Sequence, residues 1–181
     1  MPTTSLRRCA GYTLIEIVIA VAVIAILCAV ANQVAKAAAA SARSSISMAA
    51  MHSALVTAQR TSFARYQHVV LCSSADGTSC SGSNQWEHGW IAFVDANGDR
   101  QHQPDERVIL REPAAAKGQF IRTSDARTRL VFQPHGGASA GSNATFVFCS
   151  SDTDKVSALV LANSGRIRQE TPDAGKAAYC N

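Results

Sequence analysis

The sequence lacks the residue patterns on which most enzymes and metal sites depend. Its six cysteines include no pair separated by two residues, so a zinc ribbon or a thioredoxin-like redox site is not expected. The five histidines show no metal-ligand spacing, and no nucleophile, base and acid recur in a catalytic pattern. The sequence therefore predicts neither an enzyme nor a protein that carries a metal or a cofactor.

A strong excess of positive charge is also missing. The chain has 17 basic and 13 acidic residues, a formal charge of +4. Arg7 and Arg8 contribute two of these charges near the N-terminus, and the remaining 15 basic and 13 acidic residues leave about +2. Overall charge thus does not indicate a nucleic-acid-binding protein, and any basic site has to be local.

Four of the cysteines lie in the polar part of the chain. They can form two disulfides in an exported domain, with three possible connectivities, or remain free thiols in a reducing compartment. We favour Cys72–Cys80, which would close a local loop, and Cys149–Cys180, which would hold the C-terminal tail.

One long apolar stretch stands near the N-terminus. From Leu14 to Ala31 the only charged residue is Glu16, and as a helix these 18 residues would span about 27 Å, close to a bilayer core. Arg7 and Arg8 precede it, as expected when the N-terminus stays in the cytoplasm. A secretory signal peptide and a plain membrane anchor are the alternatives, but the small-residue cleavage site at Gly11 comes before the apolar stretch and not after it.

A carboxylate at the start of a membrane span is costly and calls for a partner. Cleavage after Gly11 would create an amino group at Tyr12, which could pair with Glu16 of a neighbouring copy. The stretch "GYTLIEIVIAVAVIAIL" resembles the class III signal of type IV pilins and type II secretion pseudopilins. The resemblance implies cleavage by prepilin peptidase after Gly11, N-methylation of Tyr12, and subunit docking through Glu16. Tyr12 departs mildly from the family's usual phenylalanine.

Residues 31–65 are alanine-rich and contain no glycine or proline, so the helix is expected to continue to about Arg65. Apolar residues recur there at near-helical spacing, and the methionines among them are expected to be core residues against a sheet rather than ligands. They are Ile46, Met48, Met51, Leu55, Ala58 and Phe63.

Beyond Tyr66 the pattern changes to short strands separated by turns. Strands are expected at residues 68–72, 89–95, 107–111, 119–122, 129–133, 144–149 and 156–162, with a hairpin turn at Asn97-Gly98. The predicted class is α+β, a long N-terminal helix packed on a head of antiparallel sheets. The predicted segments are a leader at 1–11, the helix at 12–65 and the head at 66–181.

Two motifs in the head have simpler explanations than the chemistry they suggest. Asp95–Glu106 resembles a calcium-binding loop, but Arg100 occupies the position that requires glycine, so an acidic hairpin tip is the better interpretation. Gly137–Gly141 matches G-x-S-x-G, but a nucleophile elbow needs a strand before it and a helix after it. A flexible loop between strands is expected there.

The basic residues gather in two places. Lys117, Arg122, Arg127 and Arg129 surround the segment "KGQFIRTSDARTR", and Arg166 and Arg168 flank Ile167. On an extended strand Arg166 and Arg168 would project from one face, about 7 Å apart, comparable to the spacing of phosphates along one nucleic-acid strand. A solvated strand face is the simpler alternative, because isolated surface arginines are common.

The order Cys72, Cys80, Trp86, "GWIAFVDANGD" and a late "GRIR" resembles the GspH/FimT family of minor pilins and pseudopilins. This resemblance covers nearly the whole chain. It implies a DNA contact at Gly165, Arg166 and Arg168. The first basic group has no motif of its own, so Lys117 and Arg122 are only possible helpers, and Gln169 could add a neutral donor for phosphate oxygens.

The implied function is non-specific binding of double-stranded DNA for uptake in natural transformation. The implied partners are other major and minor pilins, and the implied location is the inner membrane with a periplasmic head, then a pilus on the cell surface. The alternative is a purely structural minor pilin, or a GspH-like pseudopilin of type II secretion.

Overall fold

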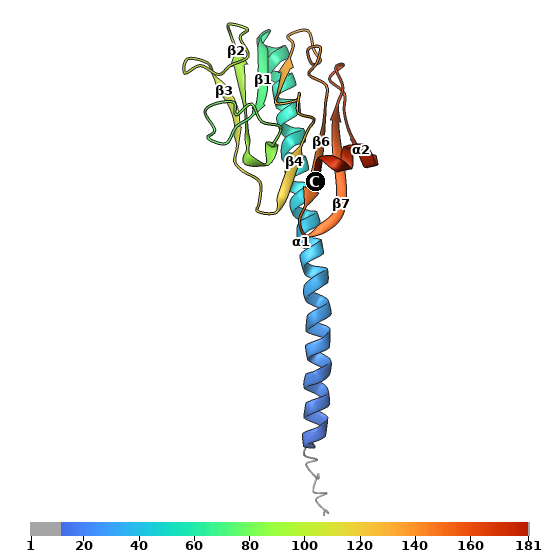
Figure 1. Ribbon diagram of the computed structural model, residues 1–181. Coiled ribbons are helices and arrows are strands. Elements are labelled where there is room, and N and C mark those ends of the chain that lie inside the picture. The colour runs from blue at the N-terminus through green and yellow to red at the C-terminus, as the bar shows by residue number, and fades with distance from the viewer. Residues whose placement is uncertain (1–11, 181) are drawn as a thin grey trace, which may run out of the picture. The chain divides into compact units, whose positions relative to one another are not determined.

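The computed structural model describes residues 12–180, and the leader segment with Gly11 lies outside the described residues. The chain divides into two compact units after Ala38, and a single helix, α1 (Leu14–Arg65), contributes to both. Figure 1 shows its course. The expected continuation of the helix to about Arg65 is therefore confirmed.

In the first unit the apolar side chains of α1 are exposed, from Leu14 to Val34. Thr13 caps this helix, since its hydroxyl accepts a hydrogen bond from the backbone N–H of Glu16 at 3.4 Å. The first 18 helical residues are long and apolar enough to cross a membrane. They contain the exposed Cys28.

The described residues of the second unit form eight strands in two four-stranded sheets. The first sheet has the order β3-β2-β1-β5 and the second β4-β6-β7-β8, with every pairing antiparallel. The strands are β1 (His68–Ser73), β2 (Trp90–Asp95), β3 (Val108–Glu112), β4 (Gln119–Arg122), β5 (Arg129–Phe132), β6 (Ala144–Ser150), β7 (Thr153–Leu161) and β8 (Ile167–Glu170). The predicted α+β class, with two antiparallel sheets, is confirmed.

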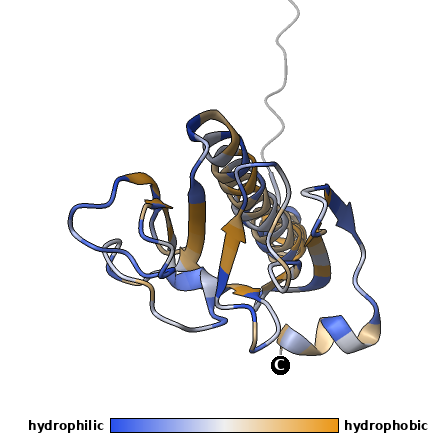
Figure 2. Ribbon diagram, turned by 90° about the horizontal axis from the view of Figure 1, so that it is seen from above, coloured by the Kyte–Doolittle hydropathy of each residue, from blue (hydrophilic) through white to orange (hydrophobic). Residues whose placement is uncertain are grey.

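The main core lies between the second half of α1 and the inner faces of both sheets. Met51 and Leu55 of the helix are fully buried there, together with Phe146 and Leu159 of the second sheet. Trp86 packs edge-on against Phe146 with ring centroids 5.1 Å apart. In Figure 2 apolar strands lie alongside this helix.

The methionines of this half of α1 are core residues, as predicted, but its apolar residues do not all share one face. Met48, Met51, Leu55 and Ala58 are buried, but Ile46 and Phe63 are 68% and 70% exposed. The buried residues follow steps of three and four, which keep one helix face turned to the core. Ile46 and Phe63 fall out of step with that series and emerge on the other side.

The segment after Asp95 is the loop between the antiparallel strands β2 and β3, where the acidic hairpin tip was predicted. β2 ends at Asp95 and β3 begins at Val108. The buried Asp95 carboxylate accepts hydrogen bonds from the backbone N–H groups of Gly98 and Arg100, at 2.8 and 3.2 Å. Glu106 likewise accepts from Ala96 and Gln103. These carboxylates thus hold the loop's own backbone.

Both favoured disulfides are present. Cys72 at the end of β1 bonds to Cys80 in the following loop, and Cys149 of β6 bonds to Cys180 in the C-terminal tail. The tail consists of α2 (Ala174–Ala177) and a 3-10 turn, η2 (Ala178–Cys180). In Figure 2 this tail lies across the second sheet from α1, so it covers the outer face of that sheet.

Candidate nucleic-acid interface

The motif Gly165-Arg166-Ile167-Arg168 forms the turn into β8, which is an edge strand of the second sheet. The turn is a three-residue loop in which the N–H of Gly165 donates to the carbonyl of Ala162 at 2.9 Å, and the N–H of Ala162 donates to the carbonyl of Arg166 at 3.0 Å. Its last residue, Gly165, has a φ of 81°. This is the common three-residue hairpin, which needs a left-handed residue at that position.

Gly165 itself is buried and is not a surface contact residue. A Cβ added there would stand 2.3 Å from Nε2 of Gln59 and 3.1 Å from Cα of Gly137. The neighbouring N–H of Ala138 donates to the carbonyl of Asn163 at 2.9 Å. Gly165 therefore allows the tight backbone conformation of the turn. The loop that contains the G-x-S-x-G pattern packs against this turn.

Strand alternation sorts the motif into two faces. Ile167 is half-buried and packs against the main core opposite Leu161. Arg168 pairs with Val160 on the other, outer face, and both arginines are exposed. Among residues 12–180, the Arg166 guanidinium has no ion-pair or hydrogen-bond partner. Ile167 is therefore the inward-facing anchor of the motif and Arg168 projects outward, whereas Arg166 precedes β8, so the projection of both arginines from one strand face stays a prediction.

Arg168 is not free. Its Nη2 and Nε donate to Oε2 of Glu170, at 3.1 and 3.3 Å, and the other oxygen of Glu170 accepts from Nζ of Lys176 at 2.9 Å. The hydrogen bond from Lys176, followed by that from Arg168, holds the pKa of the Glu170 carboxyl below its ordinary value. At neutral pH the group is therefore a carboxylate beside the arginines. Neither Glu170 nor Lys176 was predicted from the sequence to belong to this site.

Two of the possible helpers lie at the wrong edge of the sheet. Arg122 is on β4 and Lys117 just precedes it, whereas β8 is the opposite edge strand of the order β4-β6-β7-β8. Three strand spacings separate the edges by about 14 Å. These residues therefore do not join Arg166 and Arg168 in one cluster.

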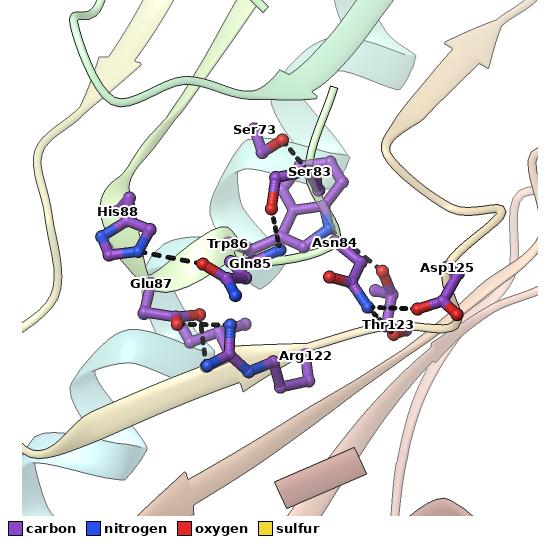
Figure 3. Close-up of polar contacts among 11 residues, drawn as sticks. Ser73, Ser83, Asn84, Gln85, Trp86, Glu87, His88, Arg122, Thr123 and Asp125 are labelled. Carbon is purple, nitrogen blue, oxygen red and sulfur yellow. Dashed lines mark hydrogen bonds and ion pairs between the residues drawn. The ribbon is translucent and has the colours of Figure 1, made fainter. Parts of the chain in front are cut away.

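Arg122 is further occupied by an ion pair. Its guanidinium meets the carboxylate of Glu87 in the 3-10 turn η1 (Trp86–His88), with side chains only 20% and 9% exposed (Figure 3). Glu87 also accepts the backbone N–H of Ile121. The pair thus fastens η1 to β4, which is a structural role.

The third helper, Gln169, points to the other side of the strand. It pairs with Leu159, and it lines a hollow beside Met48 and Ser45 of α1. Because successive residues of a strand alternate, its amide lies on the opposite face from Arg168. The expectation that Gln169 assists the arginines is therefore not supported.

The remaining basic residues of the first group are also dispersed. Arg127 donates from Nε to the carbonyl of Asn143 at 2.6 Å, and Arg129 donates from Nη1 to the carbonyl of Arg100 at 2.9 Å. Each of these arginines braces a loop of the head.

Both the head and the N-terminal part of the chain are similar to known protein families. The family profile "Type II transport protein GspH" matches residues 47–165, and the profile "Prokaryotic N-terminal methylation motif" matches residues 6–32. The chain belongs to the GspH family. It is a protein of the minor-pilin or pseudopilin kind, as the sequence resemblance implied.

Two crystal forms of the type IV minor pilin FimU of Pseudomonas aeruginosa are similar to this chain at 19% identity and a TM-score of 0.48. The similarity covers 74% of this chain and 86% or 90% of FimU. No curated protein matches the chain.

Membership of this family implies processing by prepilin peptidase and contacts with other pilins. The methylation motif and the apolar first part of α1 together are the features of a single-pass inner-membrane precursor that enters a filament. The family consists of structural filament proteins rather than enzymes.

The ion pair between Arg122 and Glu87, which fastens η1 to β4, is expected to stabilise the head. Replacing Arg122 by methionine leaves the buried Glu87 carboxylate without its partner, and we expect the free energy of unfolding to fall by about 3 kcal/mol. Chemical denaturation of the full chain in a nonionic detergent measures this. The double variant Glu87→Gln, Arg122→Met removes the orphaned charge and should recover part of the loss; a single variant as stable as the unmodified protein would contradict the assigned role.

Proposed function

We propose that this minor pilin binds double-stranded DNA without sequence preference, through Arg166 and Arg168, for uptake in natural transformation. The observation that carries the proposal is the exposed Arg166 guanidinium, which has no partner among the described residues and stands at an edge strand beside Arg168. Phosphate contacts of this kind position DNA without reading its sequence. The head would lie in the periplasm before assembly and on the pilus afterwards.

The same proposal gives roles in processing and assembly to Gly11, Tyr12 and Glu16. Cleavage after Gly11 and methylation of Tyr12 would give the mature chain, and Glu16 in the first turn of α1 would dock onto a neighbouring subunit. Residues 1–11 would be lost as a leader. Glu16 would then serve assembly, whereas the arginines serve DNA.

A fluorescence titration of a labelled duplex with the full chain in nonionic detergent tests the DNA contact. In the variant Arg166→Gln, Arg168→Gln we expect weaker binding at low salt. We also expect the slope of log affinity against log salt to fall by about 2, since each lost phosphate contact removes about 0.9. The two arginines also differ in what binding requires of them: Arg166 is free, whereas Arg168 has to leave Glu170.

A matched control removes two other exposed arginines, Arg60 and Arg65, from the helix of the same unit. The variant Arg60→Gln, Arg65→Gln has the same net charge, so it separates a local contact from a general charge effect. Equal affinities and equal salt slopes for the two double variants would refute the DNA site.

The family match supports a second candidate function. A GspH-type pseudopilin of a type II secretion system, or a minor pilin that only primes assembly, would need Glu16 and α1 but not the arginines. Under this alternative, secretion or filament assembly depends on Glu16, and the arginine variants behave as the unmodified protein does.

A further inference from the structure

The carboxylate of Glu170 stands between the proposed DNA contact and the C-terminal tail. One of its oxygens accepts from Arg168 and the other from Lys176, at 3.1 and 2.9 Å. Glu170 and Arg168 lie two apart on β8, and both project from the outer face of the second sheet. DNA phosphates would therefore have to compete with this carboxylate for the Arg168 guanidinium.

Lys176 reaches Glu170 because two features hold the tail in place. The Asp173 carboxylate accepts the backbone N–H of Lys176 at 2.9 Å and so caps α2. The Cys149–Cys180 disulfide fastens the end of the tail to β6, the second strand from the β4 edge. The short segment between β8 and Cys180 therefore crosses the outer face of the sheet and carries Lys176 to Glu170.

Lys176 offsets the negative charge of Glu170 beside the proposed DNA contact. Without Lys176, Glu170 would have Arg168 as its only basic partner among the described residues, and its negative charge would repel an approaching phosphate. With Lys176 bound, the Glu170 carboxylate interacts with two cations, and its attraction for Arg168 is weaker. The exposed Asp173 carboxylate also lies 3.6 Å from Nζ of Lys176, a longer and more solvated contact than that with Glu170 at 2.9 Å. The hydrogen bond with Glu170 also raises the pKa of Lys176, so the lysine remains charged.

We infer that Lys176 is a positioning residue for DNA binding: held by the Cys149–Cys180 bridge, it neutralises Glu170 and so leaves Arg168 available to phosphate. The inference rests on the proposed DNA function of Arg166 and Arg168. It gives the C-terminal tail a role in that function, and it makes the disulfide part of the DNA site.

Four proteins test the inference as a double-mutant cycle: the unmodified chain, Lys176→Gln, Glu170→Gln and the double variant. We expect Lys176→Gln to bind a labelled duplex about fivefold more weakly and Glu170→Gln to bind about threefold more tightly, the range typical of exposed charge pairs. In the Glu170→Gln background, Lys176→Gln should change the affinity by less than about twofold, because the carboxylate at 2.9 Å is gone and only the exposed Asp173 carboxylate, 3.6 Å from Nζ, remains beside the lysine.

The salt dependence separates positioning from direct contact. If Lys176 acts only through Glu170, the salt slope of the Glu170→Gln variant should not change when Lys176→Gln is added. A slope lower by about 1, with the same loss of affinity in both backgrounds, would mean that Lys176 binds phosphate itself and would overturn the inference. An unchanged affinity in Lys176→Gln alone would also overturn it.

Two further variants complete the design. Lys155→Gln removes a lysine from β7 that lines the hollow on the α1 side of the sheet, so it is a charge-matched control that should affect binding little. Cys149→Ser with Cys180→Ser should reproduce the loss seen in Lys176→Gln and add nothing to it. Circular dichroism checks that this variant is folded. If the folded variant binds DNA as the unmodified chain does, the Cys149–Cys180 disulfide has no part in DNA binding.

The experiment also distinguishes the two proposals. If Arg166→Gln, Arg168→Gln binds as the unmodified chain does, the proposed function fails and the cycle has no bearing on DNA. If that variant loses affinity while Lys176 and Glu170 behave additively, only the inference about Lys176 fails.

Discussion

Cells in which this chain carries Arg166→Gln and Arg168→Gln are expected to lose about 100-fold in transformation frequency while they keep normal pili. Two hydrogen-bonded contacts to charged phosphates at about 1.5 kcal/mol each amount to about 3 kcal/mol, or roughly 100-fold in affinity. Both side chains are exposed, Arg166 in the turn before β8 and Arg168 on the outer face of β8, so their loss leaves the core intact. Counting transformants with a selectable marker, beside pili on electron micrographs, measures both quantities.

The same experiment separates the two candidate functions. Normal pili with lost transformation support the DNA contact, whereas lost pili would assign the arginines to assembly. The Arg60→Gln, Arg65→Gln variant is the control in cells as well, because it removes the same charge from the same unit. Unaltered transformation in the Arg166, Arg168 variant would leave the purely structural role as the better account.

The sequence predicted the strands of the head because local patterns determine them. The segments around Val69, Ala92 and Phe146 are β-branched or aromatic runs bounded by turn residues, and they form β1, β2 and β6 within one or two residues of the predicted bounds. The disulfide pairing was also predictable, because loop closure favours the nearer cysteines. The order of the strands in each sheet was not predictable, because no local sequence pattern shows which strands lie at the edges of a sheet.

The site was predictable only in part, for the same reason. The projection of Arg166 and Arg168 follows from the period of a strand, and so does the opposite orientation of Gln169, which the helper assignment overlooked. That Arg122 belongs to the other edge depends on the order β4-β6-β7-β8. The contact of Lys176 with Glu170 depends on where the disulfide brings the tail, which is a tertiary relation.

Gly165 is expected to contribute to the stability of the folded head. Replacing it by alanine is expected to lower the free energy of unfolding by about 3 kcal/mol, from two separable causes. The first is its φ of 81°, which costs a residue with a Cβ about 1 kcal/mol. The second is crowding, because the new Cβ would come closer than van der Waals contact to the side-chain amide of Gln59 and to Cα of Gly137.

Gly141 separates these causes, because its φ is 80° and a Cβ added there would have no atom within 4 Å. Gly141→Ala should therefore lose only the conformational part, about 1 kcal/mol. Chemical denaturation of both variants in nonionic detergent gives the crowding energy as their difference. Equal losses would mean that Gln59 moves aside freely and that the turn has no tight support. Where Gly165→Ala remains folded, it should still bind DNA, since the glycine positions Arg166 and Arg168 but makes no contact of its own with phosphate.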